Sequence, residues 1–252
     1  MKKNRIVLII ILAISFSGIN IINAQTESKK EESPVSVSCD MMSRYVWRGS
    51  DFGASPSIQP GIEFSNSGFT IGTWGAYALN LNGVQEADLY IGYTFKDVFS
   101  LTVTDYFFPE ETASYQYFDY NSSTTGHILE TTLSFKGTDK IPLSVLIASN
   151  VWGADARKMN TDGTVGNIQY STYAELGYSY KNLNAFIGFN LTNPDEYHGE
   201  SGFYGDAVGV VNLGLTAIKN IEITDKFSLP LSVSLITNPQ AGKIYLLAGF
   251  SF

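Results

Sequence analysis

The chain has 252 residues, of which 24 are Asp or Glu and 16 are Lys or Arg, so its formal charge is −8. An acidic chain is a poor candidate for nucleic-acid binding, because phosphates must be neutralised by cations. The single cysteine, Cys39, cannot form an internal disulfide, so oxidative cross-linking is not expected to hold the fold. The abundance of aromatic residues and glycine, with 15 Tyr, 16 Phe and 23 Gly, favours an all-β chain.

The N-terminus has the order of a secretory signal peptide. Three basic residues among the first five precede an apolar run over 6–22, and Ala24 offers a small residue for cleavage. We therefore predict a signal peptide over residues 1–24, with an uncleaved inner-membrane anchor as the alternative. Cleavage would leave 13 basic and 24 acidic residues, a formal charge of −11. Residues 25–34, which are polar and charged, predict a disordered periplasmic leader.

After the leader the hydrophobic pattern has a period of two. Leu229, Leu231, Val233 and Leu235, for example, alternate with small polar residues. No apolar run of about 18 residues recurs, which excludes a helical membrane protein. The predicted strands cover 35–48, 56–65, 69–80, 87–95, 98–108, 125–136, 141–152, 167–180, 184–192, 208–220, 229–237 and 242–252. They predict an all-β fold over residues 35–252, a transmembrane antiparallel up-and-down β-barrel of about twelve strands.

The connections between these strands alternate in length. Short turns are predicted at 66–68, 96–97, 137–140 and 181–183, with a longer one near 221–228, and the intervening loops include 109–124, 153–166 and 193–207. A bacterial barrel has short turns on its periplasmic side and longer loops outside the cell, whereas a soluble sandwich has no reason for this alternation. We therefore predict an outer-membrane protein with both termini in the periplasm.

Aromatic residues are sorted by strand end. Those expected at the periplasmic ends of the apolar face are Phe64, Phe69, Phe95, Phe99, Phe135, Tyr180 and Phe252, and those expected at the outer interface are Tyr45, Trp47, Tyr77 and Tyr170. Such rings are typical of the two levels where a barrel meets lipid headgroups. The last strand ends with Gly249, Phe250 and Phe252, which we interpret as the signal read by the barrel-assembly machinery.

Three short segments carry a family resemblance. The stretch 43–49 reads SRYVWRG, followed by PSIQPG at 56–61 and GTWG at 72–75. This opening resembles the TorF-like porin family, also known as the Gcw_chp family of exported bacterial proteins. The resemblance implies an outer-membrane location and a role as a pore. It transfers no catalytic residue.

The phase of the strands predicts which charged side chains face the barrel interior. They are Asp40, Arg44, Arg48, Glu63, Asp88, Glu130 and Glu175. On the lipid side a Lys or Arg would cost roughly 2–4 kcal/mol at the midplane, so these charges are expected inside. They would line a narrow channel for small solutes or, alternatively, pair with one another in a packed polar plug.

The predicted outer loops are rich in acidic residues, among them Asp51, Glu86 and Asp155. An acidic entrance concentrates cations, so a cation preference is one hypothesis. Solvated loops that bind divalent ions bridging lipopolysaccharide are the other. The expected partners are outer-membrane lipid, lipopolysaccharide and small solutes, and nothing in the sequence specifies an oligomeric state.

The sequence offers little for catalysis, because it holds only two histidines. His127 has Ser122 and Ser123 nearby in sequence but lacks a nucleophile motif, and His198 lies in the acidic loop stretch 195–200. We expect no enzymatic activity and no cofactor. A non-conducting structural or adhesive barrel, acting through loops 109–124 and 193–207, is the alternative to a channel.

Overall fold

A computed structural model describes residues 33–80, 84–109, 116–225 and 227–252. The predicted signal peptide, 1–24, and leader residues 25–32 lie outside this part of the chain. Apart from one 3₁₀ turn, η1 (Glu196–His198), the regular structure of the described ranges is β-strand. No helix in these ranges is long and apolar enough to cross a membrane.

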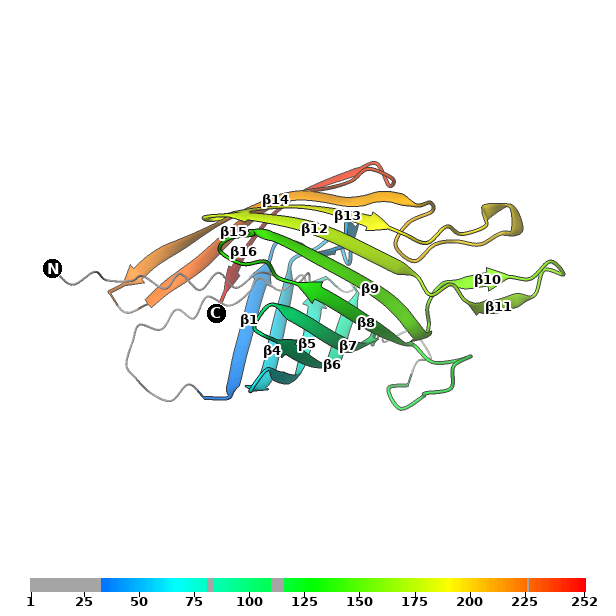
Figure 1. Ribbon diagram of the computed structural model, residues 1–252, viewed down its shortest axis with the longest axis horizontal. Coiled ribbons are helices and arrows are strands. Elements are labelled where there is room, and N and C mark those ends of the chain that lie inside the picture. Colours follow the sequence, from blue (N-terminus) through cyan, green and yellow to red (C-terminus); the bar gives the residue numbers. More distant parts are fainter. Residues whose placement is uncertain (1–32, 81–83, 110–115, 226) are drawn as a thin grey trace.

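Twelve strands close into one antiparallel barrel (Figure 1), which confirms the predicted fold class. They are β1 (Val35–Met42), β4 (Ser57–Asn66), β5 (Phe69–Ala78), β6 (Gln85–Phe95), β7 (Phe99–Phe107), β8 (His127–Phe135), β9 (Leu143–Gly153), β12 (Thr172–Tyr180), β13 (Leu183–Asn190), β14 (Gly209–Thr224), β15 (Phe227–Asn238) and β16 (Lys243–Ser251). Each pairs with its neighbour in the chain, and β16 returns to β1. Closure pairs strand edges that would otherwise stay open, which an apolar surrounding requires.

The outer surface of the barrel is apolar because successive side chains of a strand point to opposite faces. Val103 and Leu101 on β7 are 37% and 48% exposed, and Ile147 on β9 is 48% exposed. The alternate residues, such as Thr102 and Thr104, are half-buried or buried. A continuous belt of exposed aliphatic side chains is unfavourable in water and suits contact with lipid acyl chains. The barrel is therefore built to span a membrane.

Short turns gather at one end of the barrel, here called the turn end. Residues Ser67 and Gly68 connect β4 to β5 with φ of 52° and 83°, the left-handed values that a two-residue type I′ hairpin needs. The connection predicted near 221–228 is shorter than expected, because β14 continues to Thr224 and β15 begins at Phe227. Six of the seven aromatics predicted for this end are well exposed, and the seventh, Phe135, packs on Phe99 at 5.0 Å between ring centroids.

The long connections gather at the opposite end, here called the loop end. The connection between β9 and β12 forms a two-stranded arm, β10 (Arg157–Met159) and β11 (Val165–Ile168), which projects away from the barrel (Figure 1). The connection between β13 and β14 contains η1. The loop-end connections therefore contain the regular structure that lies outside the barrel wall, namely β10, β11 and η1.

The first predicted strand is wrong in its second half. The prediction ran over 35–48, but β1 ends at Met42 and the chain then turns into the barrel as a hairpin of β2 (Val46–Trp47) and β3 (Ser50–Asp51). Tyr45 and Trp47, expected at the outer interface, are therefore buried inside, at 3% and 7% exposure. A period-two pattern is the same in a strand that follows the wall and in one that leaves it, so the pattern alone missed this turn.

A charge scan tests the assignment of faces. We expect Val103→Arg, halfway along β7 on the outer face, to lower the free energy of unfolding in lipid vesicles by about 2–4 kcal/mol. Thr102→Arg, its inward neighbour beside Gly92, is the matched control and should cost much less. Urea unfolding measures both, and equal losses would contradict the outward position of Val103.

Candidate functional site

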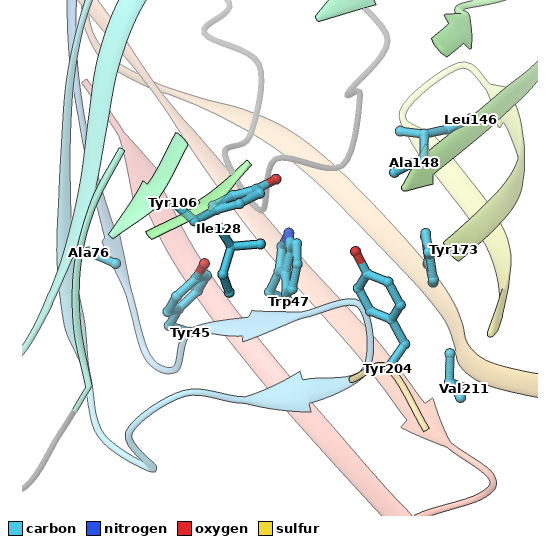
Figure 2. Close-up of a cluster of buried hydrophobic side chains, with 10 residues drawn as sticks. All are labelled: Tyr45, Trp47, Ala76, Tyr106, Ile128, Leu146, Ala148, Tyr173, Tyr204 and Val211. Carbon is cyan, nitrogen blue, oxygen red and sulfur yellow. The ribbon is translucent and has the colours of Figure 1, made fainter. Parts of the chain in front are cut away.

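The hairpin over residues 43–56, here called the plug hairpin, crosses the barrel interior. It leaves β1 and returns to β4, which are neighbours in the wall. Figure 2 shows its strands carrying Tyr45 and Trp47 into a cluster of buried side chains that includes Tyr106 and Tyr204. In the closed strand order β8 stands nearly opposite β1, so a contact between the hairpin tip and β8 spans the lumen.

That contact is a buried ion pair between Arg48 and Glu130. The guanidinium meets both carboxylate oxygens, one of them at 3.0 Å from Nη2, and both side chains are 1–2% exposed. Tyr204, Thr132 and Tyr106 donate further hydrogen bonds to Glu130 at 2.7, 2.9 and 3.1 Å. Arg48 also donates to the Tyr204 hydroxyl at 2.6 Å. A two-pronged pair whose carboxylate accepts several further hydrogen bonds is a geometry in which a buried charge is tolerated, and only the Arg48 Nε lacks a partner on the guanidinium.

Aromatic rings surround the guanidinium. Arg48 Cζ lies 4.3, 4.7 and 5.1 Å from the ring centroids of Trp47, Tyr173 and Tyr204. Trp47 in turn packs on Tyr106 at 5.5 Å. The negative faces of these rings attract the cation and exclude water from the ion pair. The lumen at this level is therefore filled by one charged pair within an aromatic shell.

The tip of the hairpin rests on the wall at Gly49. Its φ is 83°, and a Cβ built there would lie 2.0 Å from the carbonyl oxygen of Val211 on β14. Asn238 on β15 donates to the Gly49 carbonyl at 3.3 Å. Arg48, with φ of 48°, precedes it in a left-handed conformation. Only glycine has both the backbone freedom and the missing side chain that this approach requires.

A second loop contributes to the filling. The connection between β13 and β14 brings Phe203 and Tyr204 inward, and their rings lie 4.8 Å apart. Asn190 anchors it by donating to the carbonyls of Thr192, Gly205 and Ala207 at 2.9–3.0 Å.

The same loop is tied to the β10–β11 arm. Glu200 accepts hydrogen bonds from the backbone N–H groups of Asp195 and Met159, both at 2.9 Å. Those two donors lower the pKa of Glu200 below its usual range. Since Met159 belongs to β10, the loop that supplies Tyr204 and the projecting arm are held together through one carboxylate.

The turn-end half of the interior differs from this filled half. Many of its inward side chains are small, hydroxyl-bearing and half-buried: Thr94, Ser100, Thr102, Ser134, Ser144 and Ser179. Thr94 and Ser100 hydrogen bond to each other at 2.9 Å. The barrel therefore has a loop-end half filled by the plug hairpin and Tyr204, and a turn-end half lined by the wall strands, where Phe186 lies over Gly214 and the Tyr90 hydroxyl lies over Gly72.

The residues predicted to line the lumen are distributed over both halves. Asp40, Asp88 and Glu130 are buried inside the wall, and Glu63 and Glu175 point inward with partial exposure. Arg48 lies on the plug hairpin, and Arg44 lies at its base in an ion pair with Asp51. The sequence pattern had placed both arginines on a wall strand over 35–48, and this was wrong, because β1 ends at Met42. That these seven residues line a conducting path stays a prediction.

Two acidic residues assigned to outer loops from the sequence are in fact buried. Glu86 lies on β6 and is 2% exposed. Asp155 is 4% exposed and binds the Asn150 side chain and the Ser171 backbone N–H at 2.9 and 3.0 Å. The period of two extended back from Leu89 places Glu86 on the inward phase, and that signal could have found it.

The histidines are both engaged. His127 Nδ1 lies 2.8 Å from Asp105 and Nε2 lies 2.6 Å from the Tyr117 carbonyl, so no ring nitrogen is left for a serine. Ser123, one of the two serines considered, bonds to Asn121 instead. His198 Nδ1 lies 2.7 Å from Asp195 and lowers the pKa of that carboxyl. Across the described ranges, no group of three or more Asp, Glu, His or Cys side chains is placed to hold a metal ion.

The C-terminal residues close the barrel. Phe250 and Gly249 pair with Met41 and Met42 of β1, and the Phe252 backbone N–H donates to Cys39 at 3.1 Å. The β1–β16 register covers three residue pairs, against eight for β1–β4. Recognition of Gly249, Phe250 and Phe252 by an assembly machinery stays a prediction.

A family model described as a bacterial protein of unknown function, Gcw_chp, matches residues 28–192. The chain belongs to the Gcw_chp family. The match begins before β1 and reaches the start of the β13–β14 connection, so it includes the plug hairpin and Glu130. It extends well past the three segments that carried the resemblance. The TorF-like part of that resemblance stays a prediction.

Solved structures that resemble this Gcw_chp protein are barrels of low sequence identity. A KdgM porin is 10% identical with a TM-score of 0.45, and the alignment covers 85% of this chain and 98% of that one. A porin of Rhodopseudomonas blastica is 11% identical with a TM-score of 0.38, over 78% and 55% of the two chains. BamA from Haemophilus ducreyi is 14% identical with a TM-score of 0.42, over 82% and 41%. No curated protein matches the sequence.

The ion pair predicts a non-additive mutational cycle. Arg48→Met leaves Glu130 buried without its cation, and we expect a loss of about 3–5 kcal/mol in the free energy of unfolding. The double variant Arg48→Met/Glu130→Leu leaves no unpaired buried charge. Its loss in the free energy of unfolding should be clearly smaller than the sum of the losses in the two single variants. Urea unfolding in detergent micelles measures the cycle, and additive losses would contradict the coupling.

The glycine at the tip predicts a selective effect on the plug hairpin. Gly49→Ala and Gly163→Ala replace residues with φ of 83° and 81°, but a Cβ at Gly163, in the β10–β11 arm, meets nothing within 4 Å. Both variants pay about 1–2 kcal/mol for the left-handed backbone. Only Gly49→Ala must also lift the tip off Val211, so Trp47 emission should shift to the red in that variant alone. A matching shift in Gly163→Ala would count against the docking of the tip.

Proposed function

We propose that this protein is an outer-membrane channel of narrow bore, for passive diffusion of small solutes and with a preference for cations. The observation that carries the proposal is that the plug hairpin fills the loop-end half of the interior, whereas the turn-end half is lined by the wall strands themselves. Eight strands enclose a space that side chains fill by themselves, and twelve enclose more. In a barrel of this size the inserted hairpin would determine the minimum diameter of the channel.

The balance of inward charges supports the cation preference. The two arginines are taken up by Asp51 and Glu130. Among the described residues no salt bridge joins the buried carboxylates of Asp40, Glu86 or Asp88 to a basic group. An interior with an excess of carboxylates lowers the electrostatic energy of a cation and raises that of an anion.

The proposed location is the outer membrane, with both termini in the periplasm. The apolar outer belt, the predicted signal peptide and the short turns at the end where the chain finishes support it. Lipid and lipopolysaccharide would contact the outer face, and the barrel-assembly machinery would read Gly249, Phe250 and Phe252.

A second candidate is a non-conducting structural or adhesive barrel. The nearly complete burial of Trp47, Arg48 and Tyr204 favours it, since a plug packed this closely leaves little room for water. Its contacts would be made by the outer loops, where Phe118 and Tyr197 are 88% and 92% exposed.

Conductance in planar bilayers separates the two candidates. We expect small or rare current steps from the natural protein and several-fold larger steps when residues 44–55 are replaced by a short Gly-Ser linker. The matched control replaces 161–164 at the tip of the β10–β11 arm, which lies outside the lumen and leaves the Met159–Glu200 contact in place, and should leave the steps unchanged. In a salt gradient the reversal potential should have the sign of a cation-selective pore.

A folded barrel that lacks the plug hairpin and still carries no current would overturn the channel and leave the second candidate. A reversal potential of the opposite sign would overturn the cation preference while leaving the channel. Correct folding is checked independently by the change in gel mobility between heated and unheated samples.

A further inference from the structure

Two carboxylates stand next to each other on the inner face of β6. Glu86 and Asp88 are separated by one residue, so both point inward, and they are 2% and 1% exposed. They lie in the loop-end half of the barrel, where Trp74 of β5 pairs with Asp88 and Ala76 pairs with Glu86.

Oxygen atoms in this region lack hydrogen-bond partners. Both carboxylate oxygens of Asp88 and Oε2 of Glu86 are buried and meet no donor at full hydrogen-bond geometry, although the Tyr45 hydroxyl lies beside Glu86 and the Phe107 backbone N–H lies beside Asp88. The amide oxygen of Gln59, on β4, is also unpartnered, and this side chain is 1% exposed. The β4–β5 register sets Gln59 opposite Ala76, and Ala76 is opposite Glu86. Since Ala76 projects only a methyl group, Gln59 and Glu86 face each other across it.

The nearby cationic side chains already form ion pairs with other carboxylates. Arg44 is paired with Asp51, and Arg48 is paired with Glu130. Within the described ranges, no salt bridge reaches Glu86 or Asp88. Two adjacent carboxylates cannot both stay ionised in a buried site without a counter-charge, because desolvation and mutual repulsion disfavour it. Either a proton or a cation must occupy the space between them.

The surroundings favour a cation. The ring of Tyr45, from the plug hairpin, and the indole of Trp74 pack together at 5.5 Å, with Trp74 opposite Asp88 in the register and the Tyr45 hydroxyl beside Glu86. An aromatic and hydroxyl environment of this kind tolerates positive charge next to the carboxylates. Carboxylate and amide oxygens are the ligands of hard cations, and softer metals prefer sulfur or imidazole.

We propose that Glu86 and Asp88, with the Gln59 amide oxygen, bind a hard metal cation of the Ca²⁺ class inside the barrel. The site holds two carboxylates and one neutral oxygen donor, so it falls outside the groups of three or more Asp, Glu, His or Cys side chains, of which the described ranges contain none placed for a metal ion. It lies between the wall and the plug hairpin, so the cation would hold Tyr45 against β6. The proposal does not require the barrel to conduct.

Terbium luminescence tests the site in the full-length protein in detergent micelles. Tb³⁺ replaces Ca²⁺ at oxygen sites and emits when a nearby indole is excited. We expect a saturable emission that Ca²⁺ displaces. It should be lost in Trp74→Phe, although calorimetry with Ca²⁺ should still show binding in that variant.

The decisive variant is Glu86→Gln/Asp88→Asn, for which we expect at least ~10-fold weaker binding of Tb³⁺, about 1.4 kcal/mol. The matched control, Asp195→Asn/Glu196→Gln, removes the same charge from an exposed loop and should bind as the natural protein does. If the decisive variant does not fold, Gln59→Leu, which keeps both carboxylates, should still weaken binding measurably.

Absence of saturable emission from the natural protein would overturn the proposal and indicate that the pair shares a proton. Unchanged affinity in the folded carboxylate variant, or in Gln59→Leu, would overturn it as well. Because the measurement is of binding, failure of the cation site and failure of conductance in planar bilayers are seen separately.

Discussion

The structure depends on one constraint, that every backbone group of a sheet surrounded by lipid must find its partner within the sheet. Twelve antiparallel strands meet it by closing on themselves, with β16 returning to β1. Closure then sorts the side chains, since period-two alternation sends aliphatic residues outward and polar residues inward. It also creates an interior too wide for wall side chains to fill, and the plug hairpin and Tyr204 fill its loop-end half.

The filling is held by a buried charge pair and not by apolar packing alone. A buried ion pair contributes little net stability compared with a well-packed apolar pair, but breaking it strands a charge at a high cost. The pair of Arg48 and Glu130 therefore acts chiefly to specify where the hairpin tip docks, with Gly49 allowing contact with the wall. The segment SRYVWRG that carried the family resemblance is the first half of the plug hairpin, so its Arg48 and Gly49 have a structural explanation.

Charge accounting links the plug to the rest of the interior. Because the two inserted arginines are paired with Asp51 and Glu130, neither is left to pair with the carboxylates elsewhere on the inner face. The plug therefore fills part of the barrel and brings its own counter-charge for each arginine. This connects the proposed cation preference with the proposed site at Glu86 and Asp88, although each is open to its own measurement.

The sequence by itself determined the barrel, its strand number and the face of most wall residues. Hydrophobic alternation and turn length are local properties, so both can be taken from the order of the residues alone. Asp40, Asp88 and Glu130 were placed inside on that basis, and they are. Only the tertiary structure decided that the chain leaves the wall after Met42, that Tyr45 and Trp47 are internal, and that Arg48 meets a residue 82 positions away. A hairpin inside the barrel has the same alternation as a strand in its wall. Which residue lies across the lumen from Arg48 depends on how the twelve strands close, and no local sequence pattern carries that information.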